Sequence, residues 1–234
     1  MKFSLLIPGV AIALACTSLS AAEPAGDWQS LFDGRSLDGW AVTGKPEGWA
    51  VEDGAIACKV KGGAYLYTKK QYENYVLSLD FKVSPPMPKM NPKTKKEEMK
   101  KCNSGVFVRW SDLKNPVHTG IEIQVYDSVG VATPGKHDCG AIYDMVAPSK
   151  NAEKPVGEWN RMVITCKGPV IAVELNGEKI CEMNADQFAV AGQNPDGTTN
   201  KFKFAWKDMP RMGHIGFQDH GHPVWFKDIK IKVD

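Results

Sequence analysis

Two polar side chains that could handle protons or sugar hydroxyls, Glu122 and Gln124, share one strand-like run at residues 120–126. Ile121, Ile123 and Val125 alternate with them, so the isoleucines and valine are expected to face a core. Glu122 and Gln124 then face the opposite way. A carboxylate beside a planar amide is compatible with three interpretations: a solvated strand face, a sugar-binding surface or an active site.

Alternation in three further runs places more polar groups on faces opposite a core. These runs are residues 75–83, 103–110 and 214–220. The polar or aromatic residues on those faces are Asp80, Asn103, Phe107, Arg109, His214, Gln218 and His220. If the runs are neighbouring strands, Arg109, Glu122, Gln124, Gln218 and the histidines form one concave polar patch, beside the rings of Phe107, Tyr126 and Tyr143. An Arg–Glu cross-strand pair is also an ordinary stabiliser. Planar polar groups beside aromatic rings nevertheless favour a carbohydrate site.

The number of carboxylates on the Glu122 strand limits the chemistry. A retaining glycosidase uses two carboxyl groups about 5–5.5 Å apart. Asp127 falls on the face opposite Glu122, and Gln124 cannot act as a nucleophile. Asp80 or Asp219 could supply a partner from another strand, although no pattern places either one there. A single carboxylate fits a general base better than a double displacement.

Metal binding is a weaker alternative. The sequence HGH at 220–222 puts two imidazoles on one face of an extended segment, beside Asp219. No HExxH pair or comparable motif is present, and isolated histidines usually have packing or loop roles. We therefore assign no cofactor, and a divalent metal stays an alternative.

Short strand-like runs with Gly, Pro and Asn between them predict the fold. About ten such runs occur, and Asn176-Gly177 between two alternating runs is a strong hairpin signal. They predict an all-β fold, a sandwich or jelly roll of antiparallel strands. Two long segments interrupt the pattern, the Lys/Pro-rich residues 84–101 and residues 191–213. The first is expected to be a solvated loop, with a lid over a cleft as the alternative.

The N-terminal residues and the composition indicate where the protein acts and which partners it has. Residues 1–22 resemble a cleaved secretory signal, which leaves one domain at 23–234. A lipid-anchored Cys16 is the alternative. We expect a secreted or periplasmic protein without a transmembrane segment. The net charge of +2 argues against a nucleic-acid partner. Five cysteines remain after the signal: Cys58, Cys102, Cys139, Cys166 and Cys181. Cys166 and Cys181 are the first expected disulfide pair. The sequence leaves the oligomeric state open.

Several phrases together resemble the 3-keto-disaccharide hydrolase domain family. They are WQSLFDGRSLDGW, WAVEDGAI, NSGVFVRW, GIEIQVYD, CGAIYDMVAP, GEWNRMVI, LNGEKI and GHIGFQDHGHPVWFKDIKI, and they occur in this order over nearly the whole mature chain. The resemblance implies a concanavalin A-like jelly-roll sandwich of two antiparallel sheets, secretion, and activity on glycosides oxidised to a ketone at C3. Residues 84–101 appear as an insertion into that pattern.

The implied chemistry agrees with a single carboxylate. A ketone at C3 acidifies the C2 proton, so the glycosidic bond can break by β-elimination and water can then add, giving net hydrolysis. Glu122 is the expected base, Arg109 the cation that stabilises the enolate, and His214 or His220 the acid or a metal ligand. The expected hydroxyl-binding residues are Asn103, Gln124, Tyr143, Gln218 and Asp80. A sugar 3-dehydrogenase is the expected functional partner. The alternatives are a non-catalytic carbohydrate-binding module and a conventional glycan hydrolase.

Overall fold

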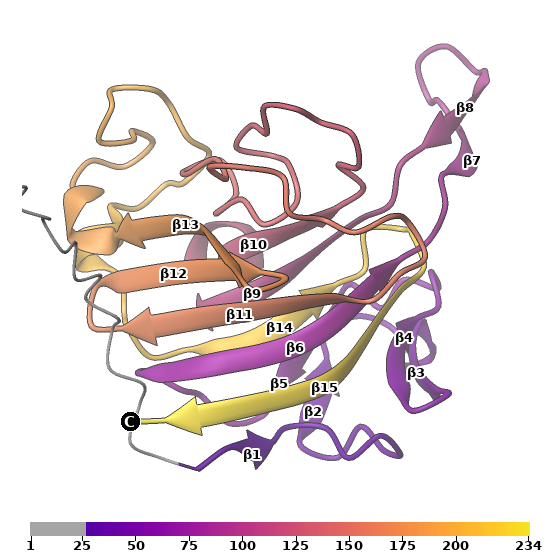
Figure 1. Cartoon of the computed structure of the whole chain (residues 1–234), viewed down its shortest axis with the longest axis horizontal. Helices are drawn as coiled ribbons and strands as arrows, with labels where there is room; N and C mark the ends of the chain where they lie inside the picture. Colours follow the sequence, from indigo (N-terminus) through magenta and orange to yellow (C-terminus); the bar gives the residue numbers. More distant parts are fainter. Residues whose placement is uncertain (1–26) are drawn as a thin grey trace, which may run out of the picture.

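The computed structural model describes residues 27–234, which form a jelly-roll sandwich of two antiparallel sheets (Figure 1). The larger sheet has eight strands in the order β13-β12-β11-β6-β15-β4-β3, and β1 also pairs with β15. Its strands are β1 (Gln29–Ser30), β3 (Trp49–Glu52), β4 (Ala55–Cys58), β6 (Tyr75–Val83), β11 (Asn160–Lys167), β12 (Val170–Leu175), β13 (Glu178–Asn184) and β15 (Val224–Val233). The predicted all-β sandwich is confirmed.

The smaller sheet has five strands in the order β10-β9-β14-β5-β2. Its strands are β2 (Trp40–Val42), β5 (Tyr65–Thr68), β9 (Asn103–Trp110), β10 (Ile121–Tyr126) and β14 (His214–Gln218). The helical segments are short: η1 (Pro46–Gly48), α1 (Pro116–Thr119), η2 (Ala185–Gln187) and η3 (Trp206–Asp208).

The core lies between the sheets because alternate residues of each strand are apolar. Leu77, Leu79 and Phe81 of β6 are fully buried, as are Val106 and Val108 of β9. Burial of one such side chain contributes about 1.5–3 kcal/mol. Phe217 of β14 stacks on Phe226 of β15 with ring centroids 4.0 Å apart, which joins the two sheets directly.

Turn residues fix where strands end. Asn176 and Gly177 have φ angles of 53° and 85° between β12 and β13, so the predicted hairpin is confirmed. β3 and β4 form a second short hairpin. Asp53 and Gly54 form the turn between them, with φ angles of 49° and 74°.

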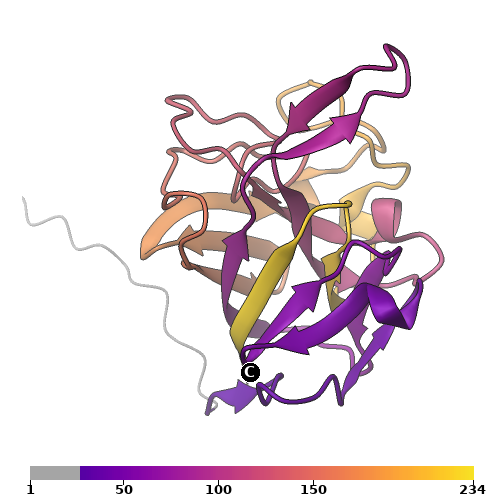
Figure 2. The same ribbon diagram turned by 90° about the vertical axis from the view of Figure 1, so that its right-hand side faces the viewer.

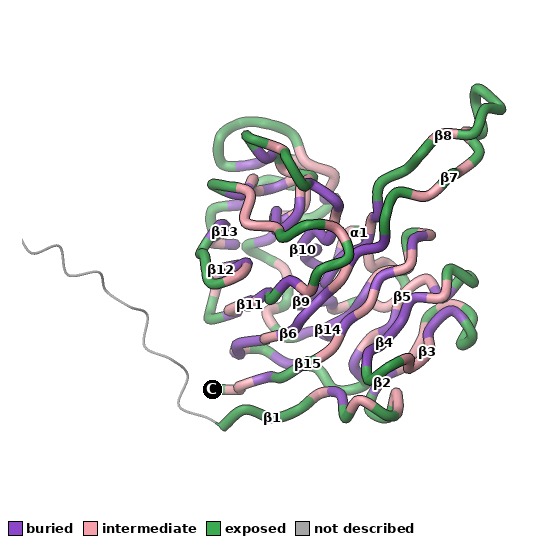
Figure 3. The backbone as a smooth tube through the Cα atoms, turned by 45° about the vertical axis from the view of Figure 1, so that its right-hand side comes forward, coloured by how far each residue is buried: buried purple, intermediate pink, exposed green. Residues whose placement is uncertain are grey.

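Residues 84–101 form a hairpin outside both sheets. β7 (Met87–Met90) and β8 (Glu97–Lys100) pair only with each other among the described strands, and Figures 1 and 2 show the hairpin projecting from the sandwich. Most of it is exposed (Figure 3). The segment stays out of the sheets, as its prolines predict, but it is a β-hairpin rather than an irregular loop. From β7, Lys89 Nζ lies 3.4 Å from His222 Nδ1, so the hairpin contacts the segment that follows β14.

The cysteine prediction is wrong. All five cysteines of the described residues are free and buried, and the strands of Cys166 and Cys181 are separated by β12. The signal segment and Cys16 lie outside the described residues. No helix within residues 27–234 is both long and apolar enough to cross a bilayer.

Candidate active site

The predicted polar face is the outer face of the smaller sheet, on strands β10, β9, β14 and β5. Glu122 pairs with Phe107, and Phe107 pairs with Gly216 on its other side. In the next row Gln124 pairs with Gly105. Strand alternation therefore places Glu122 and Gln124 together on the face opposite the core, as predicted.

Glu122 is nearly buried, with 5% of its surface exposed. Its side chain lies over Gly105, where a Cβ would come within 2.7 Å of Glu122 Oε1. Gly105 thus leaves the space that the carboxylate occupies. In the amide orientation that satisfies its neighbours, Gln124 donates to Glu122 Oε1 at 3.2 Å and to the Ser104 carbonyl at 3.3 Å. Lys201 Nζ lies 3.2 Å from Glu122 Oε2.

Burial raises the pKa of Glu122, and the charge of Lys201 opposes that rise. A carboxylate with a raised pKa is a stronger base than an exposed one, which suits proton abstraction from carbon. Burial also raises the pKa of Tyr65 and of Tyr143, and the charge of Glu122 adds to both effects. Both phenols therefore remain protonated donors at neutral pH.

Two loops bring the remaining groups to Glu122. Residues 127–159 and 185–213 lie at the same end of the sandwich in Figure 1. The Tyr143 amide donates to the Glu122 carbonyl at 2.9 Å, which continues the sheet for one residue. Lys201 Nζ sits 4.0 Å from the centre of the Tyr143 ring. The Lys201 amide donates to Asp144 Oδ2 at 2.6 Å, which joins the two loops.

Strands β14 and β5 supply the other side of the site. Gln218 Nε2 contacts the Tyr65 hydroxyl at 3.4 Å, and Gln218 Oε1 is buried without a partner in the described part of the chain. A buried acceptor of this kind can receive a substrate hydroxyl. We call Glu122, Gln124, Lys201, Tyr143, Tyr65 and Gln218 the Glu122 cluster. Asn103 borders it, with its side-chain amide 3.3 Å from that of Gln124.

Arg109 does not reach this face, so its expected placement is wrong. The pairing of β9 with β14 contains a bulge between His214 and Gly216, and Arg109 has a φ angle of 52°. Because of the bulge, Arg109 and Trp110 each face the side opposite to the one that strict alternation predicts. Arg109 is 1% exposed and its Nη2 donates to the carbonyl of Gly168, at the end of β11 in the other sheet. Trp110 takes the outer face instead and packs against Tyr65 and Tyr67.

His214 and Asp80 are also separate from the cluster. His214 Nδ1 donates to the Thr68 carbonyl at 2.6 Å, and its Nε2 accepts from Gln71 at 3.0 Å, so both nitrogens have structural partners. Asp80 lies on the larger sheet, where Arg161 holds it at 2.7 and 3.0 Å. By contrast, the His137 ring lies 4.5 Å from that of Tyr143, so His137 borders the cluster. His220 comes two residues after Gln218, at the end of β14.

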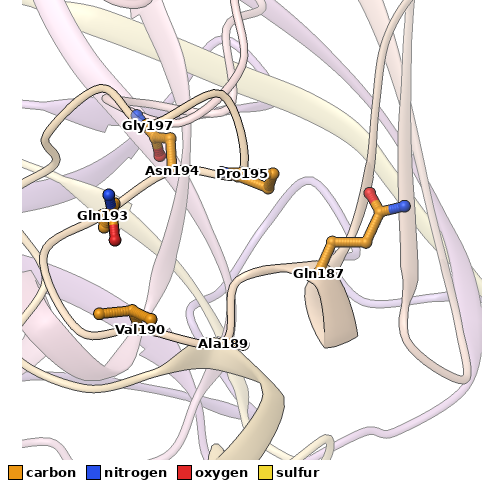
Figure 4. Close-up of a pocket in the computed structure, with 7 residues that line it drawn as sticks. All are labelled: Gln187, Ala189, Val190, Gln193, Asn194, Pro195 and Gly197. Atoms are coloured by element: carbon orange, nitrogen blue, oxygen red, sulfur yellow. The ribbon is translucent and has the colours of Figure 1, made fainter.

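No group of three or more His, Cys, Asp and Glu side chains is placed to hold a metal ion in residues 27–234. A cavity of about 210 Å³ lies within the loop that carries Lys201 (Figure 4). It is lined by Gln187, Ala189, Val190, Gln193, Asn194, Pro195 and Gly197, and so by none of the Glu122 cluster. Asn194 contributes structurally, since its amide donates to the Asp144 carbonyl at 3.2 Å.

Sequence reasoning missed Lys201, Tyr65 and His137. Lys201 and His137 lie on loops, where no periodic pattern assigns a face. The only available signal for Lys201 was the length of its loop, because long loops in compact domains are often functional. Tyr65 lies on a strand of four residues, which is too short for alternation to be persuasive.

Comparisons with known proteins identify a matching family model and several similar proteins. Residues 27–232 match the family model of the 3-keto-alpha-glucoside-1,2-lyase-like domain. A 3-keto-disaccharide hydrolase of Bacteroides thetaiotaomicron is 27% identical over 92% of this chain and 81% of its own. A candidate glycosyl hydrolase from Parabacteroides distasonis is 33% identical with a TM-score of 0.74, over 89% of this chain and 100% of its own. β-Agarase B from Zobellia galactanivorans, 11% identical with a TM-score of 0.51 over 90% of this chain and 94% of its own, shares the fold alone.

Proposed function

The chain belongs to the 3-keto-alpha-glucoside-1,2-lyase-like domain family, and we propose that it is an enzyme that cleaves glycosides carrying a ketone at C3. The related B. thetaiotaomicron protein is a 3-keto-disaccharide hydrolase by name, and this supports the substrate class. In the proposed reaction, elimination breaks the glycosidic bond and hydration of the resulting alkene completes a net hydrolysis.

Glu122 is the proposed base. Its carboxylate takes the C2 proton, which the neighbouring ketone acidifies, and the electron pair passes into an enolate. When the ketone re-forms, a C1–C2 double bond appears and the bond from C1 to the leaving oxygen breaks. Water then adds at C1 while Glu122 returns a proton to C2. Both proton transfers at C2 thus use one carboxylate.

Lys201 takes the role that the sequence assigned to Arg109. Its ammonium, 3.2 Å from Glu122, is placed to stabilise negative charge that moves from the carboxylate to the substrate oxygen. Tyr65, Tyr143 and Gln218 offer two protonated hydroxyls and one unpartnered amide oxygen to the sugar. His220, beside the cluster, remains a proposed acid from the sequence.

One observation carries the proposal: a single buried carboxylate stands between an ammonium and an amide. Asp144, the other acid brought to this end, is held by the Lys201 amide and by His137, so it is not free to act as a nucleophile. This arrangement suits proton abstraction more than double displacement.

The proposal includes the setting as well as the chemistry. A sugar 3-dehydrogenase would supply the ketone, because elimination of this kind needs an oxidised C3. We also propose export of the protein, on the strength of the secretory-type residues 1–22.

A substrate panel tests the function against its alternatives. The purified chain is incubated with a 3-keto-disaccharide and with the unoxidised parent, and released sugar is measured beside equilibrium binding of both. We expect release from the 3-keto substrate alone. Equal turnover of the parent would identify a conventional hydrolase, and binding of either sugar without turnover would identify a carbohydrate-binding module.

A further inference from the structure

The proposed elimination leaves one proton unassigned. Glu122 accepts the proton from C2, yet the leaving oxygen at C1 must also gain a proton unless it is a very weak base. A second group is therefore needed, one that can donate to the leaving oxygen and later recover a proton from the attacking water.

His137 stands beside the Glu122 cluster in a fixed orientation. Its Nε2 lies 3.1 Å from Asp144 Oδ1, and its ring packs against that of Tyr143 with centroids 4.5 Å apart and planes tilted by 31°. The opposite nitrogen, Nδ1, therefore faces away from the carboxylate. The side chain is 61% exposed, so it is accessible to a departing aglycone. Histidine is the side chain suited to proton exchange near neutral pH.

Hydrogen bonds fix the position of Asp144, which holds this imidazole. Its backbone has a φ angle of 65°, and its amide donates to the Lys136 carbonyl at 3.0 Å. Its second carboxylate oxygen accepts from the Lys201 amide at 2.6 Å. One residue thus holds both the backbone of Lys201 and the imidazole of His137, and strained backbone of this kind is frequent at functional sites.

We propose that His137 is the general acid that protonates the leaving oxygen, and that Asp144 is its positioning residue. This rests on the proposed function. His137 starts as an imidazolium, with Nε2–H donated to Asp144. As the C1–O bond breaks, its Nδ1 proton passes to the aglycone oxygen and leaves a neutral imidazole. In the hydration step Nδ1 takes a proton from the water that adds at C1, while Glu122 returns its proton to C2. Both groups end in their starting states.

His220 is the competing assignment. Its charge also acts on Glu122, but no hydrogen bond fixes its side chain within the described residues. An imidazolium whose Nε2–H is anchored on a carboxylate presents its Nδ1–H in a defined direction, which proton transfer to one oxygen requires. The geometry therefore favours His137.

Leaving-group dependence tests the assignment. Two 3-keto-glucosides are compared, one with a methyl aglycone, which needs protonation, and one with 4-nitrophenyl, which leaves as a stable anion. For His137→Gln we expect kcat/KM to fall about 10²–10⁴-fold on the methyl glycoside and less than about tenfold on the nitrophenyl glycoside. Asp144→Asn should show the same selectivity with a smaller loss.

The matched variants separate the outcomes. We expect Glu122→Gln to lose activity on both substrates, and His220→Gln to change kcat/KM by the same factor on both. An equal loss on both substrates for His137→Gln would overturn the proposal, as would a selective loss in His220→Gln. If the wild type turns over neither substrate, the proposed function fails instead. Thermal unfolding midpoints equal to the wild type confirm that each variant is folded.

Discussion

At the scale of single residues, the site depends on the environment of one carboxylate. Burial makes Glu122 more basic, while Lys201 keeps the charged form accessible. Alternation along β10 was enough to predict that Glu122 and Gln124 share a face. It could not predict Lys201, because that residue lies 79 positions later on a loop. The carboxylate was therefore predictable from sequence and its counter-ion was not.

Gly105→Ala tests how closely the carboxylate must be placed. The added Cβ would meet Glu122 side-chain atoms at 2.7–3.1 Å, and all three of its nearest contacts belong to that side chain. We expect the carboxylate to shift and kcat/KM on a 3-keto-glycoside to fall about 10²-fold. Calorimetry should show little change in stability. Full activity in this variant would show that the position of the carboxylate is not critical.

Lys201 substitutions separate charge from shape. We expect Lys201→Met to lower kcat about 10²–10³-fold, because it removes the cation that stabilises the enolate. It also removes the charge that lowers the pKa of Glu122, so the acidic limb of the kcat/KM profile should move to higher pH. Lys201→Arg keeps the charge and should retain part of the activity. Identical pH profiles for wild type and Lys201→Met would refute this role.

At the scale of elements, one bulge and two loops decide the composition of the site. Sequence alternation assumes an uninterrupted strand, and it holds in β9 as far as Val108. The bulge with β14 then directs Arg109 between the sheets and Trp110 outward. The two loops supply Tyr143, Asp144 and Lys201, whose partners are set by long-range hydrogen bonds. Such contacts leave no periodic signal in the sequence.

Glu153, on the 127–159 loop, should make stability depend on pH. Burial, with the charges of Asp127 and Asp138 adding to it, raises its pKa from 4.5 to about 8. Between these values the native state holds a proton that the unfolded chain has released. The free energy of unfolding should therefore be highest at the acidic end and fall as pH rises through about 8. Urea unfolding at pH 5 and pH 8 measures the slope, and Glu153→Gln should flatten it. An unchanged slope in the variant would show that a group other than Glu153 causes the pH dependence.

At the scale of the whole molecule, the sandwich determines which predicted residues can meet. The strand runs, the Asn176-Gly177 turn and the family phrases were sufficient to predict two antiparallel sheets. They did not say which strand belongs to which sheet. Asp80 consequently appeared beside Glu122 in the sequence reading, whereas β6 lies in the larger sheet and β10 in the smaller one. Sheet membership depends on packing between distant segments, and alternation is the same for either sheet.

The separation of sheets also explains why the site has one usable carboxylate. The larger sheet pairs Asp80 with Arg161 far from the outer face of the smaller sheet. On that outer face, the strands β9, β10, β14 and β5 contribute Glu122 together with amides, aromatic rings and glycines. Within residues 27–234 the fold thus presents the proposed general base without a carboxylate partner on the same face, which agrees with the proposed cleavage by elimination.

The most direct test is the rate of cleavage of a 3-keto-disaccharide by the wild type and by Glu122→Gln, with the unoxidised parent as control. The variant keeps the shape of the side chain but removes the base. We predict that the wild type cleaves only the 3-keto substrate and that the variant, still folded and still binding it, is slower by about 10²–10⁴-fold. Cleavage by Glu122→Gln at the wild-type rate would contradict the account.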